Sequence, residues 1–321
     1  MPLETEAVLD RRALRRRVSA WRSAFIVAGV AALGALALAA GDPQWTQQRQ
    51  IARVTIDGLI TEDRAQLQML KRLADAKNVA GVMLSINSGG GTTTGGEALF
   101  EAIRAIAKTK PVVAQFGTVA ASAAYICGLG ADHIVARGNS ITGSIGVIFQ
   151  WPEVSGLLDK VGVKMNEIKS RPLKAVPSMF EPVSPGGRQV AEQMVADGQR
   201  WFLDLVKTRR SIDTAAVPGL EQGRVFSGRE ALTYKLVDEI GGEAEAVKWL
   251  EAKAGAPPGL RVVDWRPAGG SGSGLSGWFG SAIAGMWRSA VDGHPILSSI
   301  DTIQSRLSLD GLVSVWQLHE K

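Results

Sequence analysis

The hydrophobic and polar positions in the first half of the chain alternate between two periods. Short runs rich in Val and Ile predict strands over residues 54–60, 82–86, 112–116, 133–136 and 145–148. Between these runs, apolar residues recur every three or four positions and predict helices over residues 63–77, over 97–108 and from about 121. Strands and helices that alternate in this way are typical of βαβ units, so we expect an α/β fold around a largely parallel sheet. A longer amphipathic helix is predicted over residues 189–209.

A continuous apolar segment over residues 23–41 precedes the first predicted strand. A helix needs roughly 20 apolar residues to cross a bilayer core, so this segment is long enough for one transmembrane helix. The arginines before it predict that the N-terminus stays cytoplasmic and that the rest of the chain lies on the extracytoplasmic (periplasmic) side of a bacterial-type inner membrane. Two alternatives stay open: a cleaved signal peptide, since 37–39 reads Ala-Leu-Ala, and a buried core helix.

These patterns divide the chain into four segments. We expect a basic segment over residues 1–22, a membrane anchor over 23–41, a folded domain over 42–254, and a linker with an apolar tail over 255–321. The tail carries an apolar stripe that could lie on a membrane or pack on the body or a partner subunit: Leu275, Trp278, Phe279, Ile283, Met286 and Trp287.

Composition narrows the classes of function. The 321 residues carry a net charge of +5, but the first 22 hold six arginines against three acidic residues, so the remainder is nearly neutral. The basic charge therefore fits a cytoplasmic flank, and we expect no nucleic-acid partner. One cysteine and three separated histidines exclude a disulfide framework and argue against a zinc cluster, and we expect neither metal nor cofactor.

Several common catalytic motifs are absent. The glycine-rich stretch 87–96 follows a predicted strand but lacks the G-K-[ST] ending of a P-loop and an acidic residue for a ribose. The chain has no G-x-S-x-G, S-x-x-K or H-E-x-x-H motif, and its histidines are badly placed for a Ser-His-Asp triad. A glycine turn can still present backbone N–H groups to an oxyanion. Ser122, at a strand-to-helix junction between alanines, is then the candidate nucleophile, the alternative being a small helix-packing serine.

Four ordered motifs resemble the signal peptide peptidase family, which comprises membrane-anchored serine proteases with a Clp-protease/crotonase-like fold. They are Ile86-Asn87-Ser88-Gly89-Gly90-Gly91, Ala121-Ser122-Ala123-Ala124-Tyr125, Ser140-Ile141-Thr142-Gly143-Ser144-Ile145-Gly146-Val147 and Ile168-Lys169-Ser170-Arg171-Pro172-Leu173-Lys174. A later match, Gly223-Arg224-Val225-Phe226-Ser227-Gly228 with Ala231 and Leu236-Val237-Asp238, extends the resemblance over roughly residues 50–250.

The resemblance implies a role for each matching residue. Ser122 is expected to be the nucleophile, Lys174 the general base, and Ser144 the residue that orients the lysine. The oxyanion hole is expected to be formed by the backbone at Gly90, Gly91 and Ala123. The sequence departs from the family at Gly89, where proline is usual, and at Ala123-Ala124, where Gly-Gly is customary, so we expect a looser turn and less space beside the nucleophile.

A Ser-Lys dyad sets a physical requirement on its lysine. A lysine accepts a proton only when neutral, and its ordinary pKa is about 10.4, so burial among apolar groups must favour the neutral form. The sequence around Lys174, Leu173 followed by Ala175-Val176-Pro177, permits such a pocket.

The resemblance implies a serine endopeptidase that degrades signal-peptide remnants or other short apolar peptides at the membrane, in a homo-oligomeric ring whose neighbouring subunits could share the dyad. Two alternatives are a crotonase-like acyl-CoA enzyme and a non-catalytic membrane scaffold of the same fold.

Overall fold

The computed structural model describes residues 21–30, 48–254, 258–267 and 313–315. Backbone contacts divide the chain into one unit up to Gln48 and a second from Arg49. In the first unit, residues 21–30 form a helix with exposed side chains. No helix within the described ranges is both long and apolar enough to cross a membrane. The expected anchor is described only over residues 23–30, and the apolar stripe of the tail lies outside the described residues.

The second unit is built around one mixed sheet. Its described strands are β1 (Gln50–Ile60), β2 (Val79–Thr92), β3 (Val112–Ala121), β4 (His133–Ala136), β5 (Ile141–Gly143), β6 (Val225–Ser227), β7 (Glu239–Ile240), β8 (Arg261–Trp265) and β9 (Val313–Val315). The main path runs β6-β5-β3-β2-β1-β8, with β4 beside β3, β7 beside β4, and β9 beside β2. Only the pairs β5–β6 and β2–β9 are antiparallel among these strands. The expected α/β fold with a largely parallel sheet is confirmed.

Helices of the second unit lie on both faces of the sheet. They are α3 (Arg64–Asp75), α4 (Thr93–Ala107), α5 (Ala123–Leu129), α6 (Ser155–Lys160), α7 (Pro185–Arg210), α8 (Gly228–Thr233) and α9 (Glu243–Lys253). The helices predicted near 63–77, 97–108 and 189–209 are confirmed as α3, α4 and α7. Hydroxyl and carboxyl side chains cap these helices: Asp63 accepts from the Ala65 N–H at 2.7 Å, and Ser184 from the Gly187 N–H at 3.1 Å.

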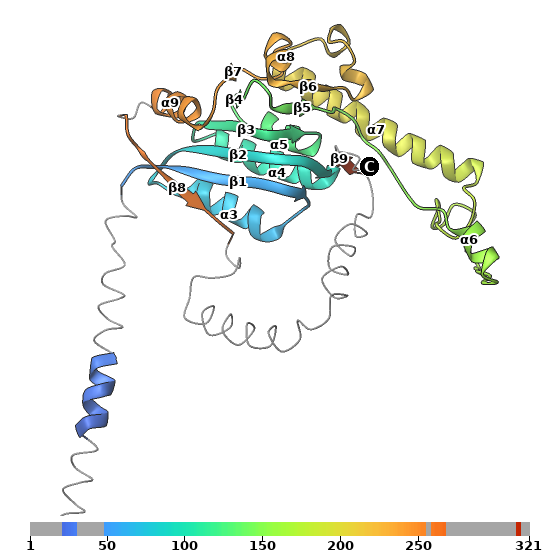
Figure 1. Ribbon diagram of the computed structural model, residues 1–321, viewed down its shortest axis with the longest axis horizontal. Coiled ribbons are helices and arrows are strands. Elements are labelled where there is room, and N and C mark those ends of the chain that lie inside the picture. The colour runs from blue at the N-terminus through green and yellow to red at the C-terminus, as the bar shows by residue number, and fades with distance from the viewer. Residues whose placement is uncertain (1–20, 31–47, 255–257, 268–312, 316–321) are drawn as a thin grey trace, which may run out of the picture. The chain divides into compact units, whose positions relative to one another are not determined.

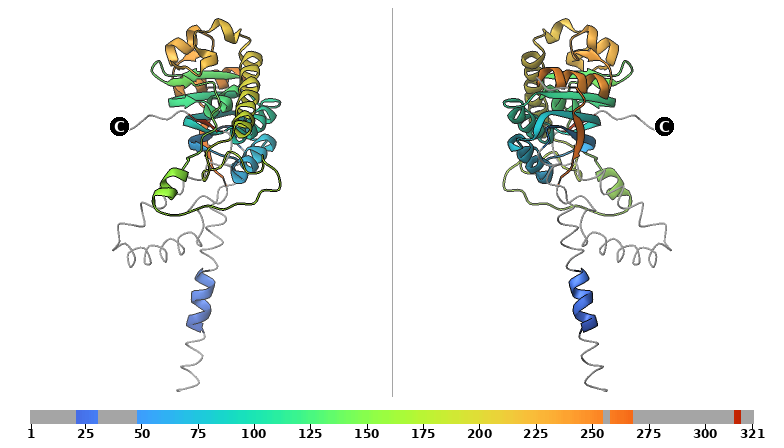
Figure 2. Two further views of the ribbon diagram at one scale, coloured as in Figure 1. Left: turned by 90° about the vertical axis from the view of Figure 1, so that its right-hand side faces the viewer. Right: turned by 90° about the vertical axis from the view of Figure 1, so that its left-hand side faces the viewer.

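The core follows the two-residue period of the central strands. Alternate residues of β1, β2 and β3, such as Val54, Leu84 and Ala114, face the larger core with α3, α4 and α5. The intervening residues, such as Met83 and Val113, face a smaller cluster with α9. Figures 1 and 2 show α3 and α4 along one face of the sheet. The sheet is therefore buried on both faces, which explains why its strands read as continuous apolar runs.

The glycine-rich stretch differs from its prediction. Residues 87–91 continue β2 instead of forming a turn, because β1 pairs with them as far as Ile60 opposite Gly91. A side chain at Gly91 could not be accommodated, since its Cβ would lie 1.9 Å from the Ile60 carbonyl oxygen. The glycines therefore allow close approach of a neighbouring backbone, which local composition does not distinguish from a turn.

Two further strands differ from the sequence prediction. The prediction of a strand over 145–148 is wrong. The paired strand is β5, which ends at Gly143. It ends there because Gly143 and Ser144 both have positive φ, 83° and 51°. In addition, β8 pairs with β1, so the sheet extends beyond residue 254, where the sequence suggested a linker.

Residues 149–184, which we call the arm, leave the sheet after β5 and return at α7. The arm includes α6 and extends away from the sheet (Figures 1 and 2). Its large apolar side chains are unusually exposed: Leu157, Val161, Val163, Met165, Ile168, Leu173, Met179 and Phe180. Large apolar side chains exposed along one segment in this way indicate an interaction site.

The far half of α7 is anchored to the core by Phe202 and Val206, both fully buried. We expect Phe202→Ala to lower the free energy of unfolding by about 3–5 kcal/mol, because it removes a large side chain and leaves a cavity. Met194→Ala on the same helix, where Met194 is 44% exposed, should change it by less than about 1 kcal/mol. Denaturant unfolding measures both values. Equal losses in the two variants would contradict this description of α7.

Candidate active site

Ser122 occupies the junction between β3 and α5. It is 1% exposed and has φ 60° and ψ −123°, a conformation that a non-glycine residue rarely adopts. Such a residue costs on the order of 1–3 kcal/mol and persists only where its surroundings hold it. Here the Ser122 N–H donates to the Gly143 carbonyl at 2.9 Å, and the Ser122 carbonyl accepts from the Ile126 N–H at 3.1 Å. The backbone is therefore fixed from both sides, and this conformation differs from that of a serine inside a regular helix.

Ser144 lies beside Ser122 at the end of the neighbouring strand. β3 and β5 are parallel, and their pairing ends with Ala121 opposite Gly143. Ser122 and Ser144 are the next residues on these two strands, whose backbones are about 4.8 Å apart in such a sheet. Ser144 also has positive φ, 51°, and its N–H donates to the Arg224 carbonyl at 3.0 Å. The structure thus brings together two of the serines expected at the site.

Hydroxyl side chains before Ser144 tie its strand to β3. The Thr142 hydroxyl donates to the Ala120 carbonyl at 2.7 Å, and the Ser140 hydroxyl donates to the Gly117 carbonyl at 2.5 Å. Both side chains are buried, so these bonds give their hydroxyl groups the partners that water would otherwise supply. Neither residue was assigned a role from the sequence, although two hydroxyl residues spaced two positions apart, one just before β5 and one within it, indicate side chains that point to the same side.

The glycine-rich end of β2 lies at the same end of the sheet as Ser122 and Ser144. Pairing between β2 and β3 stops at Ser88 opposite Ala120, two residues before Gly90 and Ser122. Gly90 has φ 116°, and its N–H donates to the Ser88 hydroxyl at 3.0 Å. The Gly90 N–H expected in the oxyanion hole is thus already engaged in this structure. Ala123 opens α5, where a backbone N–H has no acceptor within the helix.

Lys174 lies apart from the two serines within one chain. Its side chain is exposed and makes no hydrogen bond or ion pair to the described residues. The neighbouring Leu173 and Val176 lie against the first turn of α7, each 3.2 Å from where a Cβ on Gly186 or Gly187 would be. Roughly 18 Å of helix separates Gly187 from Gln199, the α7 residue whose side chain donates to the carbonyl of Ile145, next to Ser144. A single chain therefore provides neither the contact to Ser122 nor the apolar pocket expected around Lys174.

The other lysine of the same motif is held by carboxylates. Lys169 forms an ion pair with Glu167 at 2.6 Å and a second with Glu181. The hydrogen bond to Glu167, followed by that to Glu181, raises the pKa of Lys169 above the ordinary lysine value. Lys169 therefore stays protonated and is unsuited to act as a base, which leaves Lys174 as the candidate of this motif.

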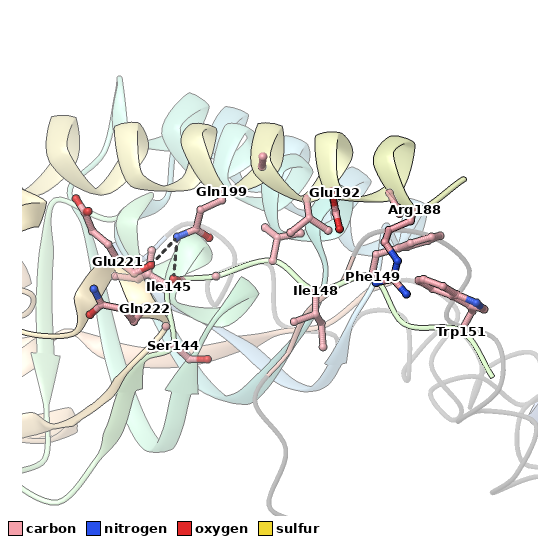
Figure 3. A pocket seen from close by; sticks show the side chains of 16 residues that line it. Ser144, Ile145, Ile148, Phe149, Trp151, Arg188, Glu192, Gln199, Glu221 and Gln222 are labelled. Carbon is pink, nitrogen blue, oxygen red and sulfur yellow. Dashed lines mark hydrogen bonds between the residues drawn. The ribbon is translucent and has the colours of Figure 1, made fainter. Parts of the chain in front are cut away.

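A groove of about 640 Å³ extends from Ser144 along α7 (Figure 3). Gln199 spans it at the Ser144 end, donating to the carbonyls of Ile145 and Glu221 at 3.4 Å each. Trp151 and Arg188 lie at the other end in the figure. Much of the lining is apolar, with Ile145, Val147, Ile148, Phe149, Trp151 and Val195. The groove can accommodate apolar side chains next to the serine pair.

Neither metal ligands nor a reactive thiol accompany these residues. Within the described ranges, no group of three His, Cys, Asp or Glu side chains is arranged to hold a metal ion. Cys127, five positions after Ser122, is fully buried, and burial raises the pKa of its thiol to about 12. A protonated thiol is not nucleophilic at neutral pH. Of Cys127 in α5 and Ser122 at its N-terminus, Ser122 is therefore the candidate nucleophile.

Comparison with known proteins gives two family matches. The model of Peptidase family S49 matches residues 104–256, and that of Clp protease matches residues 47–138. A protein of Synechocystis sp. named as a protease is 32% identical over 219 residues, covering 68% of this chain and 79% of that protein. A protein of Enterococcus faecium named as signal peptide peptidase SppA is 33% identical, covering 63% of each chain. The chloroplastic serine protease SPPA of Arabidopsis thaliana is 27% identical, covering 77% of this chain and 37% of that protein.

The burial of Cys127 predicts that its thiol does not react in the folded protein. With a pKa of about 12, only about one thiol in ten thousand is ionised at pH 8. We expect a disulfide reagent such as DTNB to leave the native protein unmodified at pH 8 and to modify one thiol per chain in guanidinium chloride. As a control, Gly156→Cys on the exposed α6, in a Cys127→Ala background, should react at once. Rapid reaction of native Cys127 would show that α5 opens more readily than its packing implies.

Proposed function

Since the chain belongs to peptidase family S49 and is a serine protease, we propose that it is an endopeptidase that cleaves signal-peptide remnants or other short apolar peptides at a membrane. Ser122 is the nucleophile and Lys174 the general base. The observation that carries this proposal is the pairing of Ala121 with Gly143, which sets a strained serine beside Ser144 at the end of the sheet. A serine that serves only for packing does not need such a conformation.

Each residue then has a step in the reaction. The Ser122 hydroxyl attacks the peptide carbonyl as its proton passes to the neutral amine of Lys174, which the Ser144 hydroxyl orients. The N–H of Ala123 and the backbone at Gly91 stabilise the oxyanion, each correctly aimed donor contributing roughly 3–4 kcal/mol. Lys174 returns the proton to the leaving amine, and the acyl-enzyme forms. Lys174 then deprotonates a water that releases the acid, and Ser122 regains its proton.

We propose that the lysine reaches this site from a neighbouring copy in a homo-oligomeric ring. Two observations support this: Lys174 is separated from Ser144 within one chain, and the arm that carries it exposes many apolar side chains. Docking of the arm on a second copy covers those side chains and removes water from the lysine. Removal of water favours the neutral amine that the reaction requires. Oligomerisation would thus complete the catalytic dyad.

The apolar groove and the N-terminal segment support the choice of substrate and location. Apolar lining beside Ser144 suits apolar peptide side chains, and a relative is named as a signal peptide peptidase. We propose that residues 23–41 anchor the chain in an inner membrane with the arginine-rich end in the cytoplasm. The catalytic domain then lies on the extracytoplasmic side, next to the peptides that membrane insertion and processing leave behind.

Two substitutions test the catalytic residues. Ser122→Ala and Lys174→Ala should each lower peptide hydrolysis at least about a thousandfold, because neither the acyl-enzyme nor the proton transfer can form without them. Lys164→Ala, which removes another exposed lysine of the arm, serves as the control and should keep most of the activity. Hydrolysis of a fluorogenic apolar peptide measures the rates, and mass spectrometry after a fluorophosphonate probe locates the modified serine. Full activity of a folded Lys174→Ala protein would exclude the dyad.

Mixing the two inactive variants tests whether the dyad is shared. If each site takes its serine from one copy and its lysine from the next, dissociating and reassembling equal amounts of Ser122→Ala and Lys174→Ala protein restores about a quarter of the sites. Each restored site combines an intact serine with an intact lysine from different chains. A dyad within one chain predicts no recovery, since every chain then carries one defect. The activity of the mixture, compared with each variant reassembled alone, distinguishes the two arrangements.

A further inference from the structure

Ser88 is a buried serine of the first motif, residues 86–91, to which the proposed mechanism gives no role. It is 3% exposed and lies in β2, two residues before Gly90. Its hydroxyl donates to the Gly58 carbonyl at 2.6 Å and accepts from the Gly90 N–H at 3.0 Å. The same hydroxyl lies 3.3 Å from the Gly90 carbonyl oxygen. One side chain thus contacts three main-chain groups on two neighbouring strands.

These contacts lie where the pairing between β1 and β2 is irregular. The register shifts between Asp57 and Leu59, and Gly58 lies within the shift. Gly58 and Gly90 have positive φ, 64° and 116°, so neither continues the extended conformation of its strand. Such an irregularity disrupts the ladder and leaves main-chain groups without their usual partners. The Ser88 hydroxyl supplies a partner, and it fixes the register in which pairing resumes with Leu59 opposite Gly90.

The same contacts set the direction of the Gly91 N–H. The Gly90 carbonyl and the Gly91 N–H belong to one trans peptide unit, so they point in opposite directions. Because the Gly90 carbonyl faces Ser88, whose hydroxyl bonds to Gly58 of β1, the Gly91 N–H is directed away from β1. β3 lies on the other side of β2, and Ser122 follows its last residue. The Gly91 N–H is thus turned to the side of the nucleophile, whereas the Gly90 N–H is held by Ser88.

We propose that Ser88 is a positioning residue of the oxyanion hole: its hydroxyl fixes the peptide unit between Gly90 and Gly91 so that the Gly91 N–H, together with that of Ala123, meets the oxyanion. The proposal rests on the proposed function, because it concerns the same site. A donor stabilises the oxyanion when it lies about 2.7–3.1 Å from the position that the oxygen takes in the transition state. A displacement of about 1 Å can cost up to about a hundredfold in rate.

The composition of this part of β2 explains why its backbone needs such a support. Residues 89–91 are three consecutive glycines, and glycine has more backbone freedom than any other residue. Gly91 cannot gain a side chain, because its Cβ would lie 1.9 Å from the Ile60 carbonyl oxygen. Gly89 stands where the family usually has proline, so no ring restrains the chain there. The hydrogen bonds of Ser88 therefore restrain a backbone that its own residues leave free.

Substitution of Ser88 in the full chain tests the proposal with two inhibitors. The Ser122 hydroxyl adds across the carbonyl of an apolar peptide aldehyde to give a hemiacetal, and the former carbonyl oxygen then occupies the oxyanion position. The corresponding peptide alcohol has no carbonyl and forms no adduct. We expect Ser88→Ala to lower kcat/KM for a fluorogenic apolar peptide about 10- to 100-fold and to raise the Ki of the aldehyde by the same factor. The Ki of the alcohol should change less than about twofold, because it reports binding without an oxyanion.

Three further variants separate positioning from packing. Ser88→Cys keeps the side chain but makes only weak hydrogen bonds, so it should lose aldehyde affinity as Ser88→Ala does. Ser88→Thr keeps the hydroxyl and should restore most of that affinity. Ser85→Ala removes a half-buried serine hydroxyl three residues earlier on the same strand, and as the matched control it should keep both inhibition constants. Denaturant unfolding shows that each variant is folded before the constants are compared.

Three outcomes would overturn the proposal in a protein whose unchanged chain hydrolyses the peptide. The first is an unchanged Ki of the aldehyde in Ser88→Ala and Ser88→Cys. The second is an equal loss of affinity for aldehyde and alcohol, which would indicate a general disturbance of the groove. The third is a folded Ser88→Thr protein that binds the aldehyde as weakly as Ser88→Ala, which would assign the effect to packing.

Failure of the proposed function gives a different result. The unchanged chain would then hydrolyse no peptide and would bind the aldehyde no more tightly than the alcohol, since no serine adds to the carbonyl. That result would refute the catalytic role of Ser122 and, with it, the role of Ser88. Tight aldehyde binding that the Ser88 variants leave intact would refute the role of Ser88 alone.

Discussion

The hydrogen bond from the Ser122 N–H to the Gly143 carbonyl is the constraint on which the site depends. It closes the last rung between β3 and β5 and turns the chain into α5 with Ser122 at positive φ. The buried hydroxyls of Ser140 and Thr142 support this rung by donating hydrogen bonds to the Gly117 and Ala120 carbonyls of β3. These hydrogen bonds hold β5 beside β3 and offset the conformational free energy that the positive φ of Ser122 costs.

The same constraint explains the divergence of β3 from β2. β3 pairs with β2 on one side as far as Ser88–Ala120 and with β5 on its other side through residues 119–121, so its last residue, Ala121, pairs with β5 after the pairing with β2 has stopped. The end of the β2–β3 pairing leaves the side of β2 at Gly90–Thr92 open to another strand. Glycines are required there because the other side of Gly91 is already in contact with Ile60. The end of the β2–β3 pairing therefore determines both the position of Ser122 and the edge of β2 beside it.

Much of this arrangement could be predicted from the sequence, and the remainder could not for identifiable reasons. The helices α4 and α7 follow from the three- to four-residue spacing of the side chains on their buried faces, and β1–β3 follow from continuous apolar runs, since both faces of the sheet are buried. Residues 87–91 read as a turn because the closeness of β1 is invisible in local composition. The sequence predicted a strand at 145–148, where the apolar run is stronger, and missed β5 at Ile141–Gly143, where a hydroxyl hydrogen bond to β3 holds the strand. The pattern at 312–315 was an ordinary strand signal, but nothing local identified its partner.

Lys174 shows a different kind of limit. Its motif identified the residue, yet the desolvation that a lysine base requires depends on what covers it, and one chain leaves it exposed. The sheet fixes Ser122 whenever the chain folds, whereas the arm presents its apolar side chains and its lysine outward. Folding of one chain therefore fixes the backbone of Ser122 without burying Lys174, and an exposed lysine does not have the apolar surroundings that favour a neutral amine.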